Sequence, residues 1–543
     1  MSNLNFTIKD AVNEPIQGYL PNSPEKKSIK EKINELKTQT FDIPIIINGQ
    51  EIRTGNTNQC VMPHNHKHVL ANYHMAGKKE INDAINSLLN SWQKWSKTSL
   101  EKRISIFHKM AELLQGPYRD LINASTMLGQ SKNVFQAEID SACELIDFFN
   151  FNCEYIYNIH KQQPKYSPSG MKNSTEYRAL EGFVFAVTPF NFTSIAANLP
   201  CAPALLGNVA FWKPASSSVY SGYFLMKLFK EAGLPDGVIN FVPGSGSKIG
   251  SQVIKHKDLA GIHFTGSTKV FQGMWKEVGN NIQNYKSYPR IVGETGGKDF
   301  ILAHKSSDID TLRTAMIRGA FEYQGQKCSA ASRCYIPIEL WKKIEQDYLK
   351  DVFAIKIGDV EDFTNFMNAV IDENSFDNIV SYIEYAKKSN EATVVTGGNY
   401  DKSKGYFIEP TTIITTNPHF KSMEEEIFGP VLTIYLYSDS WEDICKLVDS
   451  TSPYALTGAI IGLDKAAIKT GKNLLTHSAG NFYINDKPTG AVVGQQPFGG
   501  SRASGTNDKA GAPANLLRWT SQRTIKETFD SPKDYKYPFM EEK

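Results

Sequence analysis

Paired cysteines are missing from this sequence. Its seven cysteines are scattered over 543 residues, their number is odd, and no two of them show the C-x-x-C spacing. Cys328 and Cys334 share one segment, but no histidine accompanies them. A disulfide framework or a zinc site is therefore not expected, no metal is predicted, and a reducing compartment fits best.

A large excess of charge and a long apolar run are missing too. The formal net charge is only +2 and no basic stripe stands out, which argues against binding to nucleic acid. The most apolar region, residues 182–212, is interrupted by prolines and asparagines, which argues against a membrane span. The first residues lack the apolar core of a signal peptide, and the first arginine is Arg53, so a transit peptide is not expected either. The sequence therefore predicts a cytoplasmic protein without a nucleic-acid or membrane partner.

The hydrophobic period changes along the chain. Residues 1–40 are polar with a helical pattern around 25–36, which predicts a surface arm. Two short β runs, 45–47 and 51–52, flank an Asn-Gly pair and predict a hairpin. Apolar residues then recur at helical spacing over 79–159.

Beyond residue 182, short apolar runs alternate with helical patterns. The predicted strands are 183–187, 209–212, 238–242 and 261–264 in a first series, and 332–336, 393–395, 431–435 and 458–461 in a second. Strands that alternate with helices predict parallel α/β sheets with right-handed crossovers. The chain is too long for one hydrophobic core, so at least two domains are expected.

One cysteine, Cys328, follows a glycine turn in the stretch FEYQGQKCS at 321–329. A thiol is a useful nucleophile only as thiolate and titrates near ~8.5 when free, so it needs positive surroundings or a neighbouring base. Lys327 offers a positive charge in sequence. The alternative is a buried structural cysteine, the common state of an intracellular cysteine.

Two strand ends carry glycines that open a helix. Gly244, Gly246 and Gly250 have the spacing G-x-G-x-x-x-G, and FTGST follows at 264–268. Such turns let the backbone approach a phosphate at a helix N-terminus, and two neighbouring ones favour a nucleotide at the carboxyl edge of the sheet. Lys213 ends another strand, where it could reach ribose hydroxyls. Ordinary turns and a solvated lysine are the alternatives.

Glu294 and Asn191 are the remaining chemical candidates. Glu294 follows an apolar pair among glycines, where its carboxylate could activate water. Asn191 lies in an apolar stretch, where its amide could stabilise an oxyanion. The alternatives are a capping or surface glutamate and a turn-stabilising asparagine. A thiol, an amide donor, a carboxylate and a nucleotide together match aldehyde oxidation through a thioester.

The sequence resembles the aldehyde dehydrogenase superfamily in five stretches that follow the family's order. They are PFNF at 189–192, FTGS at 264–267, ETGGK at 294–298, GQKC at 325–328 and EIFGP at 426–430, within a resemblance that extends over about residues 40–525. It implies an α/β fold with a Rossmann-type cofactor domain, an α/β catalytic domain and a β-flap for oligomerisation. The expected division is an arm at 1–40, a dinucleotide-binding domain at 41–164 and 182–318, a catalytic domain at 319–499, and oligomerisation segments at 165–181 and 500–543.

Three further stretches resemble the members of the superfamily that oxidise L-glutamate γ-semialdehyde. They are residues 321–329, NFYINDK at 481–487 and GQQPFGGSRASGTND at 494–508. This resemblance implies NAD-dependent oxidation of the semialdehyde to L-glutamate, the second step of proline catabolism, by a monofunctional enzyme. The alternatives are an aldehyde dehydrogenase for another aldehyde, a non-catalytic relative, or a cysteine hydrolase, which is disfavoured because no histidine lies near Cys328 in sequence.

The resemblance also implies roles for individual residues. Cys328 attacks the aldehyde carbon, Asn191 and the Cys328 amide hold the oxyanion, and Glu294 activates water. The implied cofactor residues are Thr188, Lys213, Ser216, Gly246, Gly250, Gly266, Ser267, Thr268, Lys269, Val270, Glu426 and Phe428. Ser216 stands where many relatives carry an acid against the adenosine ribose. Without that acid the repulsion of the 2′-phosphate of NADP is weaker, but NAD is still expected over NADP. A homodimer or higher homo-oligomer is expected.

The implied substrate residues are Ser329, Gly490, Ala491, Phe192 and Phe498. Ser329 and the 489–491 loop would hold the α-carboxylate, although Ala491 replaces the family's usual serine. The two phenylalanines would enclose the aliphatic stem, with ordinary core aromatics as the alternative. Glu144 would meet the ammonium group.

Overall fold

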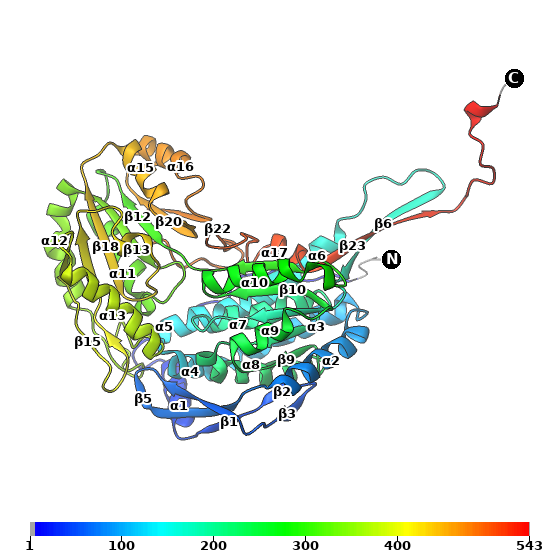
Figure 1. The fold of residues 1–543 in the computed structure, drawn as a ribbon, viewed down its shortest axis with the longest axis horizontal. Helices are drawn as coiled ribbons and strands as arrows, with labels where there is room; N and C mark the ends of the chain where they lie inside the picture. Colours follow the sequence, from blue (N-terminus) through cyan, green and yellow to red (C-terminus); the bar gives the residue numbers. More distant parts are fainter. Residues whose placement is uncertain (1–5, 542–543) are drawn as a thin grey trace.

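The computed structural model describes residues 6–541, which form two α/β bodies and a projecting ribbon (Figure 1). In this part of the chain the first body is built on a seven-stranded sheet with the order β11-β10-β7-β8-β9-β2-β3. Its strands are β2 Ile45–Ile47, β3 Gln50–Ile52, β7 Phe183–Val187, β8 Ala210–Lys213, β9 Ile239–Phe241, β10 Leu259–Thr265 and β11 Arg290–Glu294. The five strands from β11 to β9 are parallel, and β2 and β3 add an antiparallel edge.

The second body is built on a sheet with the order β14-β17-β18-β13-β12-β20-β21. Its strands are β12 Asp299–Ala303, β13 Ala331–Pro337, β14 Ala392–Thr396, β17 Thr411–Thr415, β18 Val431–Tyr437, β20 Thr457–Ile461 and β21 Asn481–Ile484. Only β14 pairs antiparallel to its neighbour in this sheet. The strands predicted in both series are confirmed, and so is the parallel α/β class.

The predicted hairpin is confirmed as well. Ile47 pairs with Gln50 across β2 and β3, which leaves a two-residue turn. Asn48 and Gly49 have φ of 52° and 73°, the left-handed values that such a turn needs and that Asn-Gly tolerates well.

Helices cover the sheets and complete the hydrophobic cores. In the first body they are α1 Pro24–Lys37, α2 Lys78–Trp95, α3 Leu100–Gln115, α4 Arg119–Gln130, α5 Val134–Ala137, α6 Glu144–Lys161, α7 Thr193–Leu205, α8 Val219–Glu231, α9 Gly246–Val253 and α10 Thr268–Asn280. In the second they are α11 Ile309–Phe321, α12 Ile338–Phe353, α13 Glu373–Lys388, α14 Lys421–Glu424, α15 Trp441–Ser450 and α16 Lys465–Leu474, and α17 Pro513–Leu517 returns to the first body. A π-helical turn, Glu138–Cys143, joins α5 to α6.

The N-terminal segment is docked on the first body. Ile29, Ile33 and Leu36 form the buried stripe of α1, which packs against α4. Tyr19 is buried and donates a hydrogen bond of 2.8 Å to Glu138. The segment therefore contributes to the core.

Shorter strands complete the molecule. β1 Phe41–Ile43, β4 Thr57–Met62 and β5 Asn65–His74 form a small sheet, and β15 Tyr400–Asp401 with β16 Phe407–Ile408 and β19 Tyr454–Ala455 with β22 Ser501–Arg502 form two-stranded pairs. β6 Met171–Ala179 and β23 Thr520–Thr528 pair antiparallel as a ribbon that projects from the first body (Figure 1).

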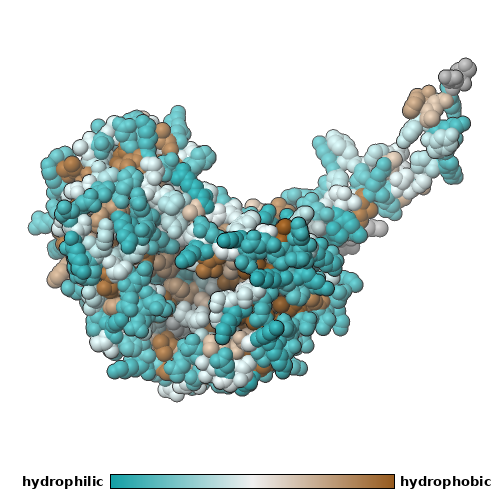
Figure 2. Space-filling model, viewed as in Figure 1, coloured by the Kyte–Doolittle hydropathy of each residue, from teal (hydrophilic) through white to brown (hydrophobic). Residues whose placement is uncertain are grey.

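The surface is largely hydrophilic on the face drawn in Figure 2. Within residues 6–541, no helix is both long and apolar enough to cross a membrane. Over the same residues, histidine, cysteine and acidic side chains form no group of three that could hold a metal ion.

Candidate active site

The proposed catalytic residues come from both bodies. Glu294 is the last residue of β11 and Asn191 lies in the turn between β7 and α7, at the carboxyl edge of the first sheet. Cys328 lies between α11 and β13 of the second body. Ligands bind at such carboxyl edges because the connecting loops there present side chains and helix N-termini to one crevice.

The loop that carries Cys328 has an unusual backbone. Tyr323, Gln324 and Gly325 follow one another with φ of 49°, 55° and 67°. Left-handed conformations cost free energy for residues other than glycine, so surrounding contacts must impose them. Tyr323 donates a hydrogen bond of 2.9 Å to the Gln130 carbonyl, and Gln324 Nε2 donates to the Ser131 carbonyl at 3.0 Å. The loop is thus held against the end of α4.

Asn191 contacts this loop directly. Its Nδ2 donates a hydrogen bond of 3.0 Å to the carbonyl of Gln326, and its side chain is buried. An amide nitrogen carries two hydrogens, so the second remains to meet an oxyanion. Asn191 and the Cys328 loop are therefore brought together as the oxyanion hypothesis requires.

Acidic groups surround the Cys328 thiol. Burial raises its pKa well above the ordinary value, and the carboxyl groups of Glu294, Asp299 and Glu426 raise it further. Lys327 does not compensate for them, because its Nζ lies 3.5 Å from Glu322 and 3.8 Å from Asp140. Lys327 is therefore paired with Glu322 and Asp140 and not with the acids around the Cys328 thiol.

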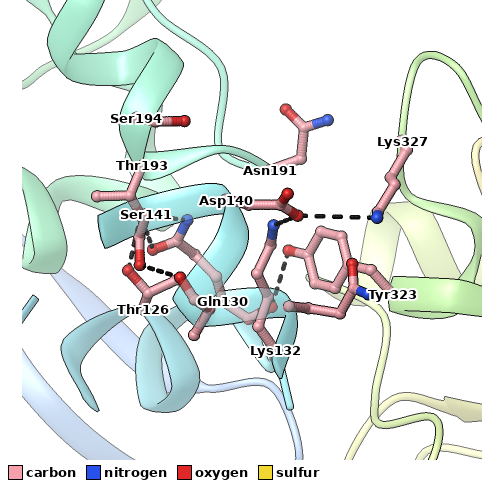
Figure 3. A network of polar contacts seen from close by, with 12 residues as sticks. Thr126, Gln130, Lys132, Asp140, Ser141, Asn191, Thr193, Ser194, Tyr323 and Lys327 are labelled. Carbon is pink, nitrogen blue, oxygen red and sulfur yellow. Dashed lines mark hydrogen bonds and ion pairs between the residues drawn. The ribbon is translucent and has the colours of Figure 1, made fainter. Parts of the chain in front are cut away.

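Figure 3 shows the polar network that receives Lys327. Asp140 lies between Lys327 and Lys132, whose Nζ donates to its Oδ2 at 2.5 Å. The Lys132 ammonium also lies 4.4 Å from the ring centre of Phe192 and 4.3 Å from that of Tyr323. Sequence reasoning did not select Lys132 or Asp140, because neither lies in a motif and their contact depends on the folded chain.

Glu294 faces a cavity that Glu144, Phe498 and Lys509 also line. Burial raises the pKa of Glu294 to about 8, while the charge of Lys509 opposes this shift. Gly499 approaches the carboxylate closely, since a Cβ there would lie 3.1 Å from Glu294 Oε1. A carboxyl group with a pKa in this range can act as a general base near neutral pH.

Lys509 was missed by sequence reasoning. The stretch GTNDK belongs to the segment that carries the family resemblance, but nothing in the sequence indicated that its lysine would approach Glu294.

Glu426 and Phe428 lie on the loop before β18. Glu426 Oε1 accepts a hydrogen bond of 3.0 Å from the Gly297 amide, and burial raises the pKa of Glu426 to about 7. A side chain at Gly296 would collide with this carboxyl group, because its Cβ would lie 2.2 Å from Glu426 Oε2. Phe428 has a φ of 57° and meets Phe190 edge-on at 5.9 Å. Both residues thus lie beside the ETGGK and PFNF segments.

The predicted cofactor residues of the first body lie along one sheet edge. Thr188 accepts a hydrogen bond of 2.9 Å from Trp212, and burial lowers the pKa of Lys213 to about 8. Gly246 begins α9, and a Cβ there would lie 3.8 Å from Lys213 Nζ. Gly250 is buried one turn further along this helix.

A second helix begins at the same edge. Ser267 is the N-cap of α10, with Gly266 before it and Thr268, Lys269 and Val270 in the first turn. Ser216 is exposed just beyond β8. Two helix N-termini, a lysine and small residues along this edge fit the diphosphate and ribose of a dinucleotide.

The predicted substrate residues lie on the other side of Cys328. Ser329 Oγ is 2.7 Å from Thr489 Oγ1, and Gly490 follows with a φ of 97°. Lys487 donates a hydrogen bond of 3.2 Å to the Thr489 carbonyl. The residue after the nucleophile and the 489–491 loop, including Ala491, are therefore adjacent, and Thr489 supplies a hydroxyl there.

Glu144 lies at the cavity that Glu294 faces. Its carboxylate accepts a hydrogen bond from Ser194, and burial raises the pKa of Glu144 to about 8. Phe498 lines the Glu294 cavity together with it. The two predicted aromatic residues thus lie on separate segments, with Phe498 at this cavity and Phe192 beside Lys132.

Comparison with known proteins gives consistent matches along the chain. The model of the aldehyde dehydrogenase family matches residues 51–525. A relative from Dictyostelium discoideum, named delta-1-pyrroline-5-carboxylate dehydrogenase, mitochondrial, is 51% identical over 536 residues, which cover 98% of this chain and 96% of that protein. The human protein of the same name is 45% identical over 531 residues, which cover 97% of this chain and 94% of that protein.

These relatives correct one prediction. The chain was expected in the cytoplasm, but the relatives from Dictyostelium discoideum and human are both named mitochondrial, so that prediction is wrong. It rested on what the first residues lack, and missing signals do not determine a compartment.

A solved structure agrees over the whole chain. The crystal structure of the delta-pyrroline-5-carboxylate dehydrogenase from Mycobacterium tuberculosis bound with NAD has a TM-score of 0.95 and 47% sequence identity, with 99% of each chain covered. This likeness confirms the predicted fold class. By sequence and by structure, the chain belongs to the aldehyde dehydrogenase family.

Proposed function

We propose that this chain oxidises L-glutamate γ-semialdehyde, which is in equilibrium with Δ1-pyrroline-5-carboxylate, to L-glutamate with NAD, the second step of proline catabolism. The names of the relatives and the NAD bound to the Mycobacterium tuberculosis protein support this substrate and cofactor. The observation that carries the proposal is the 2.7 Å contact between Ser329 and Thr489 beside Cys328. Two hydroxyl groups and the Gly490 turn beside the nucleophile support the proposal, because they would supply hydrogen-bond donors that a substrate α-carboxylate needs. By the same relatives, we propose a mitochondrial location.

The first step belongs to Cys328. Its thiolate adds to the aldehyde carbon, and the carbonyl oxygen becomes an oxyanion held by the second Asn191 N–H and the Cys328 amide. Removal of one such donor typically lowers turnover ~10²–10³-fold. NAD would supply a hydride acceptor when bound, and loss of the hydride from this carbon would leave a thioester on Cys328.

The second step belongs to Glu294. Its carboxylate takes a proton from water as the water oxygen adds to the thioester carbon, the C–S bond breaks, and glutamate and the Cys328 thiolate separate. Lys213 and the N-termini of α9 and α10 would hold the adenosine ribose and the diphosphate. Glu426 would turn from Gly297 to the nicotinamide ribose, and Phe428 would pack beside the ring.

The ribbon of β6 and β23 supports an assembly of at least two chains. An isolated two-stranded ribbon is marginally stable in water and exposes its edges, which another chain can cover. The proposed unit is therefore a homodimer or a higher homo-oligomer.

The test is NADH formation with the semialdehyde and with a panel of plain aldehydes and ω-carboxylate aldehydes. A site with donors for the α-carboxylate should favour the semialdehyde in kcat/KM by roughly tenfold or more, because its buried polar groups stay unpaired with other aldehydes. Cys328→Ala should abolish NADH formation, whereas Cys445→Ala, a buried cysteine of α15, should retain it. Equal kcat/KM over the panel would refute the substrate proposal, and a parallel series with NADP measures the cofactor preference.

A further inference from the structure

Lys509 is fixed by acceptors that carry no charge. Its Nζ donates to the carbonyl oxygens of Gly480 and Gly499, each at 2.8 Å, and to Asn481 Oδ1 at 3.3 Å. An ammonium group has three hydrogens, so these three acceptors use all of them. Among residues 6–541, no carboxylate lies within 4.0 Å of Lys509 Nζ, and its positive charge is therefore not neutralised by contact.

The same acceptors bring the charge toward Glu294. Gly499, whose carbonyl binds Lys509, lies against the Glu294 carboxylate, and both side chains line one cavity. Lys509 lowers the pKa of Glu294, and Glu294 in turn opposes the lowering of the Lys509 pKa by burial. The two groups thus interact without an ion pair.

The other groups around Glu294 do not supply a positive charge. The titratable side chains that face it are Glu144 from α6, His263 from β10, Asp508 and Lys509 from the segment after β22, and the Cys328 thiol. His263 is neutral because burial lowers its pKa to about 4. The acids disfavour a carboxylate at Glu294, and Lys509 is the cation that favours it.

We propose that Lys509 is a positioning residue for Glu294: its fixed ammonium group stabilises the carboxylate form that takes the proton from the hydrolytic water. This inference rests on the proposed function, in which Glu294 is the general base. The direction of the expected pH shift follows from the positive charge of Lys509. Loss of the charge makes the carboxylate harder to form, so thioester hydrolysis then requires a higher pH.

The test compares Lys509→Met with Lys509→Arg in the full-length enzyme. The acylation step is followed as the NADH burst, and hydrolysis is followed as glutamate release after the burst, both as functions of pH. In Lys509→Met the acid limb of hydrolysis should move up by about one pH unit, which makes hydrolysis roughly tenfold slower below the limb, while the burst changes little. Lys509→Arg keeps the charge and should return the limb toward its original pH.

Lys387→Met is the matched control. Lys387 also donates to a backbone carbonyl, that of Gly398 at 2.7 Å, but it lies in α13 away from the site, so its loss should leave the limb in place. A Lys509→Met enzyme whose hydrolysis falls equally at every pH would overturn the inference, since this result describes a displaced loop and not a lost charge.

Glu294→Gln separates this inference from the proposed function. If that variant forms the NADH burst but releases glutamate slowly, Glu294 is the base, and an unmoved limb in Lys509→Met then refutes only the role of Lys509. Undiminished glutamate release from Glu294→Gln would refute both.

Discussion

At the nucleophile, burial and the carboxyl groups of Glu294, Asp299 and Glu426 act in the same direction and raise the pKa of the Cys328 thiol. Lys327, the adjacent cation, pairs with Asp140 and Glu322. These surroundings therefore favour the thiol form of Cys328 over the thiolate. Because the thiolate is the reactive form toward electrophiles and oxidants, these surroundings lower the reactivity of Cys328 toward both.

Ser329→Ala tests the substrate side of the site. The change removes one hydroxyl from the Ser329–Thr489 pair, and a hydrogen bond to a charged group contributes about 1.5 kcal/mol or more, so KM for the semialdehyde should rise roughly tenfold. Steady-state kinetics with an uncharged aldehyde should be nearly unchanged, because that substrate has no carboxylate to bind. Ser332→Ala, in β13 of the same segment, is the control. An equal rise of KM for both aldehydes would show that Ser329 supports the loop and does not bind the carboxylate.

At the scale of the element, the turn between α11 and β13 connects two active-site segments. Gly325 has a φ of 67°, and a Cβ there would lie 2.2 Å from the Gly429 carbonyl. Glycine at this position therefore lets the loop that carries Cys328 pack against the loop that carries Glu426 and Phe428. A side chain here would push the two loops apart.

Gly325→Ala should destabilise the protein and impair catalysis together. The left-handed backbone alone costs about 1–2 kcal/mol for alanine, and the contact with Gly429 adds to it by moving the two segments apart. Thermal unfolding and kcat measured on one preparation check both effects. Gly273→Ala is the matched control, since Gly273 lies in α10 with open space around it, and alanine there should raise the free energy of unfolding by about 0.5–1 kcal/mol. A Gly325→Ala protein as stable and active as the original would contradict the steric argument.

The sequence predicts helices and strands better than it predicts the contacts of the site, because the former depend on local patterns and the latter on segments far apart in the chain. The eight strands predicted from short apolar runs and the Asn48–Gly49 turn follow from local period and local backbone preference, so they could be predicted within a few residues of their observed bounds. The left-handed Tyr323 and Gln324 could not, because the hydrogen bonds that their side chains donate to the Gln130 and Ser131 carbonyls impose a conformation that these residue types disfavour. Lys509 likewise meets Glu294 through a segment 215 positions later in the chain, which no local pattern encodes.

At the scale of the whole molecule, residues of the two α/β bodies meet at the candidate site, and the ribbon projects from the first body (Figure 1). β23 follows α17 on the first body and pairs with β6 along nine residues, from Thr520–Ala179 to Thr528–Met171. Beyond the ribbon, Phe529, Tyr535 and Phe539 are exposed. A projecting ribbon with exposed aromatic residues at its end has the character of a surface that another chain covers.

Ile525→Pro tests the proposed assembly. Ile525 pairs with Ser174 in the middle of the ribbon. Proline at position 525 removes the backbone N–H, which can donate a hydrogen bond either to β6 or at the outer edge of the ribbon. Sedimentation should therefore show a smaller species for the variant than for the original chain. Thermal unfolding of the two α/β bodies should change little, because Ile525 lies outside their hydrophobic cores. Lys533→Pro, an exposed position beyond β23, is the control and should assemble normally. An original chain that sediments as a monomer, or an Ile525→Pro chain that assembles like the original, would refute assembly through the ribbon.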